Sequence, residues 1–264
     1  MIFRQFRVEK LGQASYLLGC VRAKEGIVVD PIADLGADFY LMEAADRGLA
    51  IVHVLETHIH ADYASCAREL AEASGADHHL FHSAPVRYSF APLRDREILD
   101  IGKVRVQVLA TPGHTPEHVS YLVTDRARSE EPWFVLTGDS LFVGDVGRLD
   151  LLLGDQAVDV IDETERARLQ YQSIRNVLFS LPDHVEVYPG HYGGSACGGV
   201  NMSGKVSSTI YFEKKYNLAM QQPDEAAFAR FVRENVRPFP ENYARLKSYN
   251  LGLTGLTEQE PAHA

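Results

Sequence analysis

The sequence predicts a single domain of the α+β class. Short runs in which apolar residues alternate with polar ones are separated by segments whose apolar residues repeat at helical spacing. Hydrophobic residues make up 45% of the 264 residues and charged residues 23%, which is typical of a globular chain. Since no internal repeat or Pro/Ser-rich linker divides it, we expect one domain over residues 1–264, with residues 205–264 as a mostly helical C-terminal extension.

The first half of the chain contains a predicted β-loop-α unit. Its expected elements, in chain order, are a strand that ends at Asp30, a helix over residues 34–47, a strand over 50–56 and a helix over 64–74. Gly48 and Gly75 stand where the two helices should end, because glycine readily adopts the left-handed conformation of a helix C-terminus. The loop THIHADY joins the second strand to the second helix.

The second half repeats this theme. Strands are expected over residues 103–110, 118–124, 132–139 and 184–191, and a helix over 163–180. In the first of these strands Val104, Val106 and Val108 alternate as they would on a half-buried strand. Strand ends in this chain repeatedly carry a His or an Asp, and that repetition indicates a functional site.

Six residues at these strand ends are of the types that bind metal ions. They are His58, His60 and Asp62 in THIHADY, His114 in TPGHT, Asp139 in TGDS and His191 in YPGH. In an extended segment the first three would project to one side and converge on an ion. A lone His at a strand end is usually a turn or capping residue, but the series H-x-H-x-D, G-H, G-D and G-H predicts a metal site.

The remaining histidines of the two halves are not part of such a series of metal-ligand motifs. They are interpreted as surface or packing residues, namely His53, His78, His79, His82, His118 and His184.

Composition excludes several classes of protein. With 26 Lys+Arg against 36 Asp+Glu the formal charge is -10, which would repel a nucleic-acid backbone, so no nucleic-acid partner is expected. The three cysteines are too few and scattered for a disulfide framework. Because charges interrupt the apolar runs, we expect no signal peptide, no membrane span and a cytoplasmic protein.

The motifs THIHAD, TPGHT, TGDSLF and YPGH together resemble the metallo-β-lactamase superfamily. This resemblance covers residues of about 8–200 and implies a four-layer αββα sandwich with a metal site at one edge, between the sheets. It leaves the reaction open, since the superfamily includes zinc hydrolases, glyoxalase II-type thioesterases, nucleases, di-iron flavoproteins and iron-dependent persulfide dioxygenases.

Tyr63 is a departure from the hydrolase pattern. Hydrolases of this superfamily usually read H-x-H-x-D-H, and the final His binds a second metal, whereas this chain has Tyr63 after Asp62. A phenol is a poor substitute for neutral imidazole at zinc, so the change argues against a symmetric two-zinc site and its bridging hydroxide. The alternative is that Tyr63 only packs at the helix start and a weaker second metal persists.

The stretches GDSLFVGDVGRLDL and GHYGGSACGG resemble the persulfide dioxygenase branch. That resemblance implies one Fe(II) per chain held by His58, His114 and Asp139, with three coordination positions open and with zinc as a possible substitute metal. His60, Asp62 and His191 would then surround the iron or hold a second metal. The implied reaction oxidises glutathione persulfide, or a related thiol persulfide, with O2 to sulfite and thiol.

Four further residues are candidates for catalysis or substrate positioning. Arg148 and Asp150 match the G-R-x-D element of the branch, and a structural Arg–Asp pair that supports the metal-binding Asp is favoured over a contact with substrate. Tyr192 would direct its hydroxyl at substrate or only fill the cleft. Cys197 would relay sulfane sulfur or occupy an inert turn of small residues.

Two other functions are kept beside the persulfide dioxygenase. The first is a zinc-dependent thioesterase or hydrolase similar to glyoxalase II. The second is a non-catalytic metal-binding or persulfide-sensing module that uses Cys197. The expected partners are a small-molecule thiol persulfide and O2, and a homodimer or higher homo-oligomer is compatible with the sequence.

Overall fold

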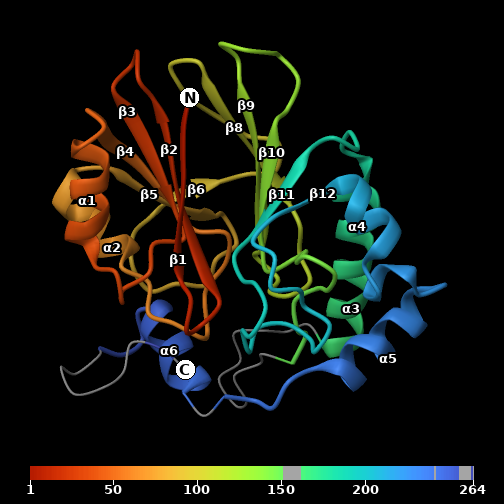
Figure 1. Ribbon diagram of the computed structural model, residues 1–264. Helices are drawn as coiled ribbons and strands as arrows, with labels where there is room; N and C mark the ends of the chain where they lie inside the picture. The colour runs from red at the N-terminus through yellow and green to blue at the C-terminus, as the bar shows by residue number, and fades with distance from the viewer. Residues whose placement is uncertain (151–161, 241, 256–262, 264) are drawn as a thin grey trace.

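The structure is a computed structural model that describes residues 1–150, 162–240, 242–255 and 263, and it consists of two six-stranded sheets packed face to face (Figure 1). The first sheet contains, in spatial order, β1 (Ile2–Val8), β2 (Gln13–Cys20), β3 (Glu25–Val29), β4 (Ala50–Leu55), β5 (Asp77–Phe81) and β6 (Ala91–Leu93). The second contains β12 (Ser208–Thr209), β11 (Glu186–Pro189), β10 (Phe134–Gly138), β9 (Val119–Asp125), β8 (Val104–Ala110) and β7 (Ile98–Ile101).

Helices cover the outer face of each sheet (Figure 1). The first sheet carries α1 (Ala37–Ala45) and α2 (Ala67–Ser74), and the second carries α3 (Glu163–Gln172), α4 (Ile210–Tyr216) and α5 (Glu225–Asn235). A sixth helix, α6 (Tyr243–Asn250), lies beneath one edge of the sandwich. The layers are therefore helix, sheet, sheet and helix, and the expected αββα sandwich of the α+β class is confirmed.

The burial of β2 shows how the sequence produces these layers. All eight residues of this strand are buried, because both faces of its sheet are covered. Leu17 points outward into the cluster with α1 and α2, whereas Leu18 points inward to the cluster between the two sheets. A strand of this kind has no polar face, and for that reason periodicity alone does not mark it.

The topology brings several strand ends to one edge of the sandwich. β10 and β11 are parallel, and β8 and β9 are antiparallel neighbours, so the loops after β8, β10 and β11 leave the second sheet at the same edge. The loop after β4 approaches this edge from the first sheet, where Val119 donates a backbone hydrogen bond to the carbonyl of Thr57. Loops distant in the sequence therefore meet there.

The sequence-based elements are largely confirmed. The expected strands correspond to β3, β4, β8, β9, β10 and β11, and the expected helices to α1, α2 and α3. The predicted helix over 163–180 continues beyond α3 as a π-helical turn (Ser173–Val177) and a 3-10 turn (Leu178–Ser180). Gly75 has φ 70° at the end of α2, as its position suggested.

The C-terminal extension is mostly helical where the structure describes it. Besides α4, α5 and α6 it contains a 3-10 turn (Ala219–Gln221) and the short strand β12. Its residues 241, 256–262 and 264 lie outside the described residues. None of the described helices has the length and apolar character that a membrane-spanning helix needs.

Candidate metal centre

His58, His114 and Asp139 meet at the edge of the sandwich. One ligand atom from each lies within 4.8 Å of the other two, and all three side chains are buried. Asp139 Oδ2 is 3.8 Å from His58 Nε2 and 3.5 Å from His114 Nε2. Because metal–nitrogen bonds are about 2.1 Å long, these separations leave room for one ion that contacts the Asp139 oxygen and the ring nitrogens of both histidines.

The electrostatic state of these groups suits a cation. Burial lowers the pKa of His58 well below its usual range and that of His114 to about 4, so both rings are neutral and offer a lone pair. Burial opposes ionisation of Asp139, but the neighbouring His191 outweighs it, and the pKa of Asp139 is lowered. Its Oδ2 is buried and has no hydrogen-bond partner among the described residues. The three side chains therefore fit a metal ion.

Each ring is oriented by a hydrogen bond from its second nitrogen. His114 Nδ1 donates to the carbonyl of Arg148 (2.8 Å), and His58 Nδ1 is 2.9 Å from the hydroxyl of Thr57. Such partners hold a ligand's tautomer and direction.

Asp139 is held through its backbone and its other carboxylate oxygen. Its N–H donates to His118 Nε2 (3.0 Å), and its Oδ1 accepts from His191 Nδ1 (2.7 Å). The preceding Gly138 has φ 49°, and a Cβ there would lie 2.6 Å from His118 Nε2. Glycine is thus required at this turn for both conformation and space.

The prediction that His58, His60 and Asp62 converge on one ion is wrong, because their side chains point to different partners. The loop that contains them is not an extended strand, so side-chain alternation does not apply. His60 turns toward Asp30, whose Oδ1 lies 3.2 Å from its Nε2. Asp62 instead accepts from His191 Nε2 (2.8 Å) and Gln13 Nε2 (3.0 Å).

His191 therefore bridges Asp139 and Asp62. Burial opposes its protonation, but the two carboxylates outweigh burial and raise the pKa of His191 well above its usual value. Asp62, His191 and Cys197 form a second group whose ligand atoms lie within 4.8 Å of one another. This group adjoins the first one through Asp139 and is the candidate second-metal position.

Tyr63 makes its hydrogen bond to His60 rather than to that second group, although its ring lies 6.2 Å from the ring of His191. Its hydroxyl is 2.8 Å from His60 Nε2, and its ring stacks on that of His60 with centroids 4.3 Å apart. Burial raises the pKa of Tyr63 well above 10, so it stays a neutral phenol rather than a phenolate ligand. The position that holds a metal-binding His in hydrolases here positions the ring of His60.

Cys197 is the buried cysteine of the second group, and it also contacts the C-terminal segment. Its Sγ is 3.1 Å from the hydroxyl of Tyr243, and only 1% of its surface is exposed. Burial, and then the charges of Asp62 and Asp139, raise its pKa well above 9. The sulfur is therefore a thiol and not a thiolate at neutral pH, which favours a packing role over sulfur relay.

Arg148 and Asp150 form a bidentate ion pair. Arg148 Nε and Nη2 lie 2.6 and 2.8 Å from the two carboxylate oxygens of Asp150, and Nη1 donates to the carbonyl of Ala196 (2.9 Å). The Arg148 carbonyl is the acceptor for His114. The pair is therefore structural, but it supports His114 rather than Asp139, the residue that the sequence predicts it to support.

Tyr192 packs in the cluster between the two sheets, where it is 8% exposed. Its hydroxyl is buried, with no hydrogen-bond partner in the described part of the chain. This location favours the cleft-filling alternative.

Three polar residues that support the site were missed in the sequence. Asp30 accepts from the backbone N–H and the hydroxyl of Thr57 (2.7 and 2.8 Å), and it also reaches His60. His118, interpreted as a surface or packing residue, is an acceptor for Asp139. Asp30 follows a strand, as the candidate ligands do, and that signal would have identified it.

Asn250 on α6 is the third of these residues. Its Nδ2 donates to the carbonyls of His60 and Tyr63 (both 2.8 Å), and its Oδ1 accepts from the N–H of Ser65 (2.9 Å). No local pattern relates Asn250 to a loop that lies 185 to 190 residues earlier.

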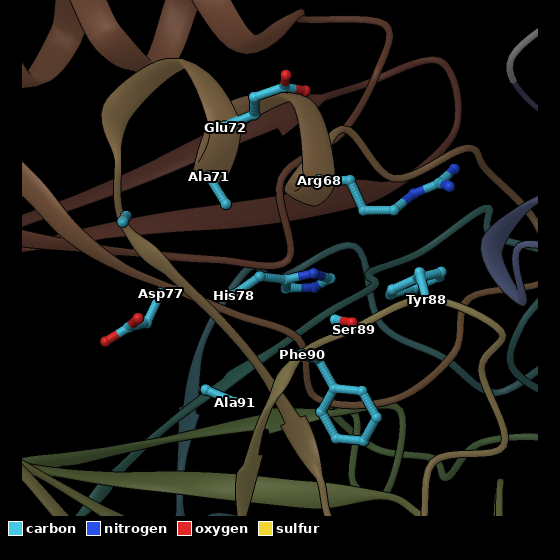
Figure 2. A pocket seen from close by; sticks show the side chains of 10 residues that line it. Arg68, Ala71, Glu72, Asp77, His78, Tyr88, Ser89, Phe90 and Ala91 are labelled. Atoms are coloured by element: carbon cyan, nitrogen blue, oxygen red, sulfur yellow. The ribbon is translucent and has the colours of Figure 1, made fainter.

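A pocket of about 580 Å³ lies elsewhere, between α2 and the strands β5 and β6 (Figure 2). His78 points into it and pairs with the buried Glu56 (2.7 Å), while Arg68 lies over the ring of Tyr88. No residue of the two groups described above lines this pocket, so it is distinct from the candidate metal centre.

Comparison with known proteins identifies the class of this fold and site. Residues 8–191 match the metallo-beta-lactamase superfamily, and the chain belongs to that family. A crystal structure described as a metallo-beta-lactamase from Staphylococcus aureus superposes with a TM-score of 0.85 at 32% identity, over 98% of this chain and 74% of that one. The structure of ETHE1 from Myxococcus xanthus covers 96% of this chain and all of that one at 28% identity, with a TM-score of 0.78.

Curated relatives include both persulfide dioxygenases and hydrolases. The human persulfide dioxygenase ETHE1 is 25% identical over 84% of this chain and 83% of its own length. A probable hydroxyacylglutathione hydrolase of Schizosaccharomyces pombe is 27% identical over 75% of this chain and 68% of its own length. The chain spans 56% of the length of a beta-lactamase hydrolase-like protein of Xylella fastidiosa, to which it is 26% identical.

Proposed function

We propose that this chain is a mononuclear iron persulfide dioxygenase. The reaction is RSSH + O2 + H2O → RSH + H2SO3, in which the outer sulfur is oxidised, dioxygen is reduced and the S–S bond is cleaved. The main observation in its favour is that the ligand atoms of two neutral imidazoles and one carboxylate converge, namely those of His58, His114 and Asp139. This donor set suits Fe(II), which, when bound, supplies adjacent open positions for a sulfur ligand and dioxygen.

The hydrogen bonds of Asp139 and His60 Nε2 favour a single ion, although His60 Nδ1 and Asp62 Oδ1 are also buried without a partner among the described residues. His191 engages Asp139 Oδ1, so Oδ2 is the carboxylate oxygen left for the ion. His60 Nε2 is engaged by Asp30 and Tyr63. The similarity to the human and Myxococcus ETHE1 proteins over most of this chain supports the same reaction.

The supporting residues exclude water and preserve geometry. The rings of His58 and His114 are at most 2% exposed, and a dry site strengthens their interaction with a cation. Arg148 keeps the ring of His114 directed at the ion through its carbonyl, and Thr57 does so for His58.

A zinc hydrolase similar to glyoxalase II is the second candidate. It is favoured by the group of Asp62, His191 and Cys197, which adjoins the first site, and by the hydroxyacylglutathione hydrolase among the relatives. A persulfide-sensing module that uses Cys197 is less well supported, because that thiol is buried and has a raised pKa.

Metal counting combined with activity separates these candidates. We expect anaerobically iron-loaded protein to bind one iron per chain, to consume O2 with glutathione persulfide and to release sulfite. Asp139→Asn should lose the iron and at least about 100-fold in activity, since changes even to the partners of metal ligands cost about 10–100-fold in metal affinity or activity.

Asp62→Asn is the matched control for the number of ions. It should keep one iron per chain under the proposal, whereas a two-metal hydrolase would lose an ion. Two zinc ions per chain with hydrolysis of S-lactoylglutathione, and no O2 uptake despite full iron loading, would overturn the proposal. We further expect a small-molecule thiol persulfide as the substrate, a cytoplasmic protein, and no nucleic-acid or membrane partner.

A further inference from the structure

A separate cluster of metal-ligand side chains lies in the first sheet. His53 is on β4, while Asp77 and His79 are on the adjacent β5, and one ligand atom from each lies within 4.8 Å of the others. The cluster shares no residue with the candidate metal centre or with the group of Asp62, His191 and Cys197.

Strand pairing explains why these three side chains meet. β4 and β5 are parallel, and His53 is paired with Asp77 while Leu55 is paired with His79. Because side chains alternate along a strand, Asp77 and His79 lie on one face of β5 and His78 lies on the other. Figure 2 shows the side chains of Asp77 and His78, which both line the pocket, on opposite sides of β5.

The geometry is close to that of a zinc site. His53 Nδ1 is 3.0 Å from His79 Nε2, and the two ring planes are 62° apart. Two histidines on a tetrahedral zinc, each about 2.05 Å from the metal, have nitrogens about 3.3 Å apart. The two atoms need only a small movement to accept an ion between them.

The charges around the cluster also favour a cation. Burial lowers the pKa of His53, and it lowers that of His79 to about 4, so both imidazoles are neutral at neutral pH. The carboxylates of Asp77 and Glu25 act on His53. Within residues 1–150, 162–240 and 242–255, neither carboxylate has an ion pair with a lysine or arginine.

The cluster is open on one side. His79 is 6% exposed and anchors the inner end, whereas His53 is half-buried and Asp77 is exposed. An ion can therefore enter from solvent and keep a water molecule as its fourth ligand.

We propose that His53, Asp77 and His79 form a second, solvent-accessible site for a divalent cation of the zinc class. Such an ion would cross-link β4 to β5, and β4 leads directly into the loop that contains His58. The site is independent of the reaction proposed above. The competing interpretation is a direct hydrogen bond between two neutral imidazoles with no metal.

The zinc content per chain distinguishes the proposed metal site from a metal-free hydrogen bond between the two imidazoles. Full-length protein and its variants would be dialysed against micromolar ZnCl2, and bound zinc would be counted by elemental analysis, with circular dichroism to check folding. His53→Gln and Asp77→Asn alter partly or fully exposed side chains, so they are expected to fold. His82→Gln, which removes an exposed histidine just beyond β5, is the matched control.

We expect wild type and His82→Gln to bind one more zinc per chain than His53→Gln. Asp77→Asn should bind this zinc more weakly by about tenfold or more, since even changes to the partners of ligands cost about 10–100-fold in affinity. Zinc bound by the candidate metal centre or by the group of Asp62, His191 and Cys197 is the same in all variants, so it does not affect the difference in zinc content between them. Equal zinc content in wild type and His53→Gln would overturn the proposal, and so would an equal loss in His82→Gln.

Discussion

Replacing Asn250 with alanine tests whether α6 holds the loop that contains the candidate metal site. The side chain is 4% exposed and makes three hydrogen bonds to that loop, two to carbonyls and one from a backbone N–H. Each such bond contributes about 0.5–1.5 kcal/mol, so the variant should lose about 2–4 kcal/mol of unfolding free energy. For a domain of this size that corresponds to a decrease in Tm of about 4–16 °C.

Differential scanning calorimetry on the metal-loaded protein measures this effect. Asn176→Ala is the matched control, because Asn176 is exposed on the second sheet's helical layer, and it should change stability by less than about 0.5 kcal/mol. We also expect Asn250→Ala to bind metal more weakly, since His60 and Tyr63 lose their backbone anchor. A Tm within about 1 °C of wild type would refute the reasoning that α6 orders this loop.

Three further predictions concern groups around the site. Burial lowers the pKa of His118 to about 3 from an unfolded value near 6.5, so the stability that neutral His118 contributes is complete above pH 6.5 and is lost as the pH falls. Urea titrations at pH 6 and pH 5 should show that His118→Gln reduces this loss of unfolding free energy by about 1.4 kcal/mol per pH unit. An unchanged dependence of the unfolding free energy on pH would contradict the lowered pKa. Arg148→Lys should cost about 1–3 kcal/mol in urea unfolding, because lysine cannot reproduce the bidentate pair with Asp150, and wild-type stability would show that the pair is dispensable. Cys197→Ser should keep persulfide-dependent O2 uptake within about tenfold of wild type if the thiol only packs, whereas complete loss would favour sulfur relay.

Much of the fold was predictable because strand and helix periods are local properties. The helix after THIHADY and its stop at Gly75 follow from apolar spacing and from the conformational freedom of glycine. β2 was not predicted, since a strand that is buried on both faces has no alternation to detect. β12 has only two residues, too short for any period to be read.

The sequence by itself determined the metal-binding residue types and their placement after strands, since the motifs are contiguous and the glycines that permit the turns are adjacent. It did not determine which side chains meet. His58 and His60 are two residues apart, yet one faces Asp139 and the other faces Asp30 and Tyr63. Partners contributed by other elements decide those directions, because a loop without regular structure imposes no alternation. The pairing of β4 with β5 likewise brings His53 beside His79, which only the tertiary structure could show.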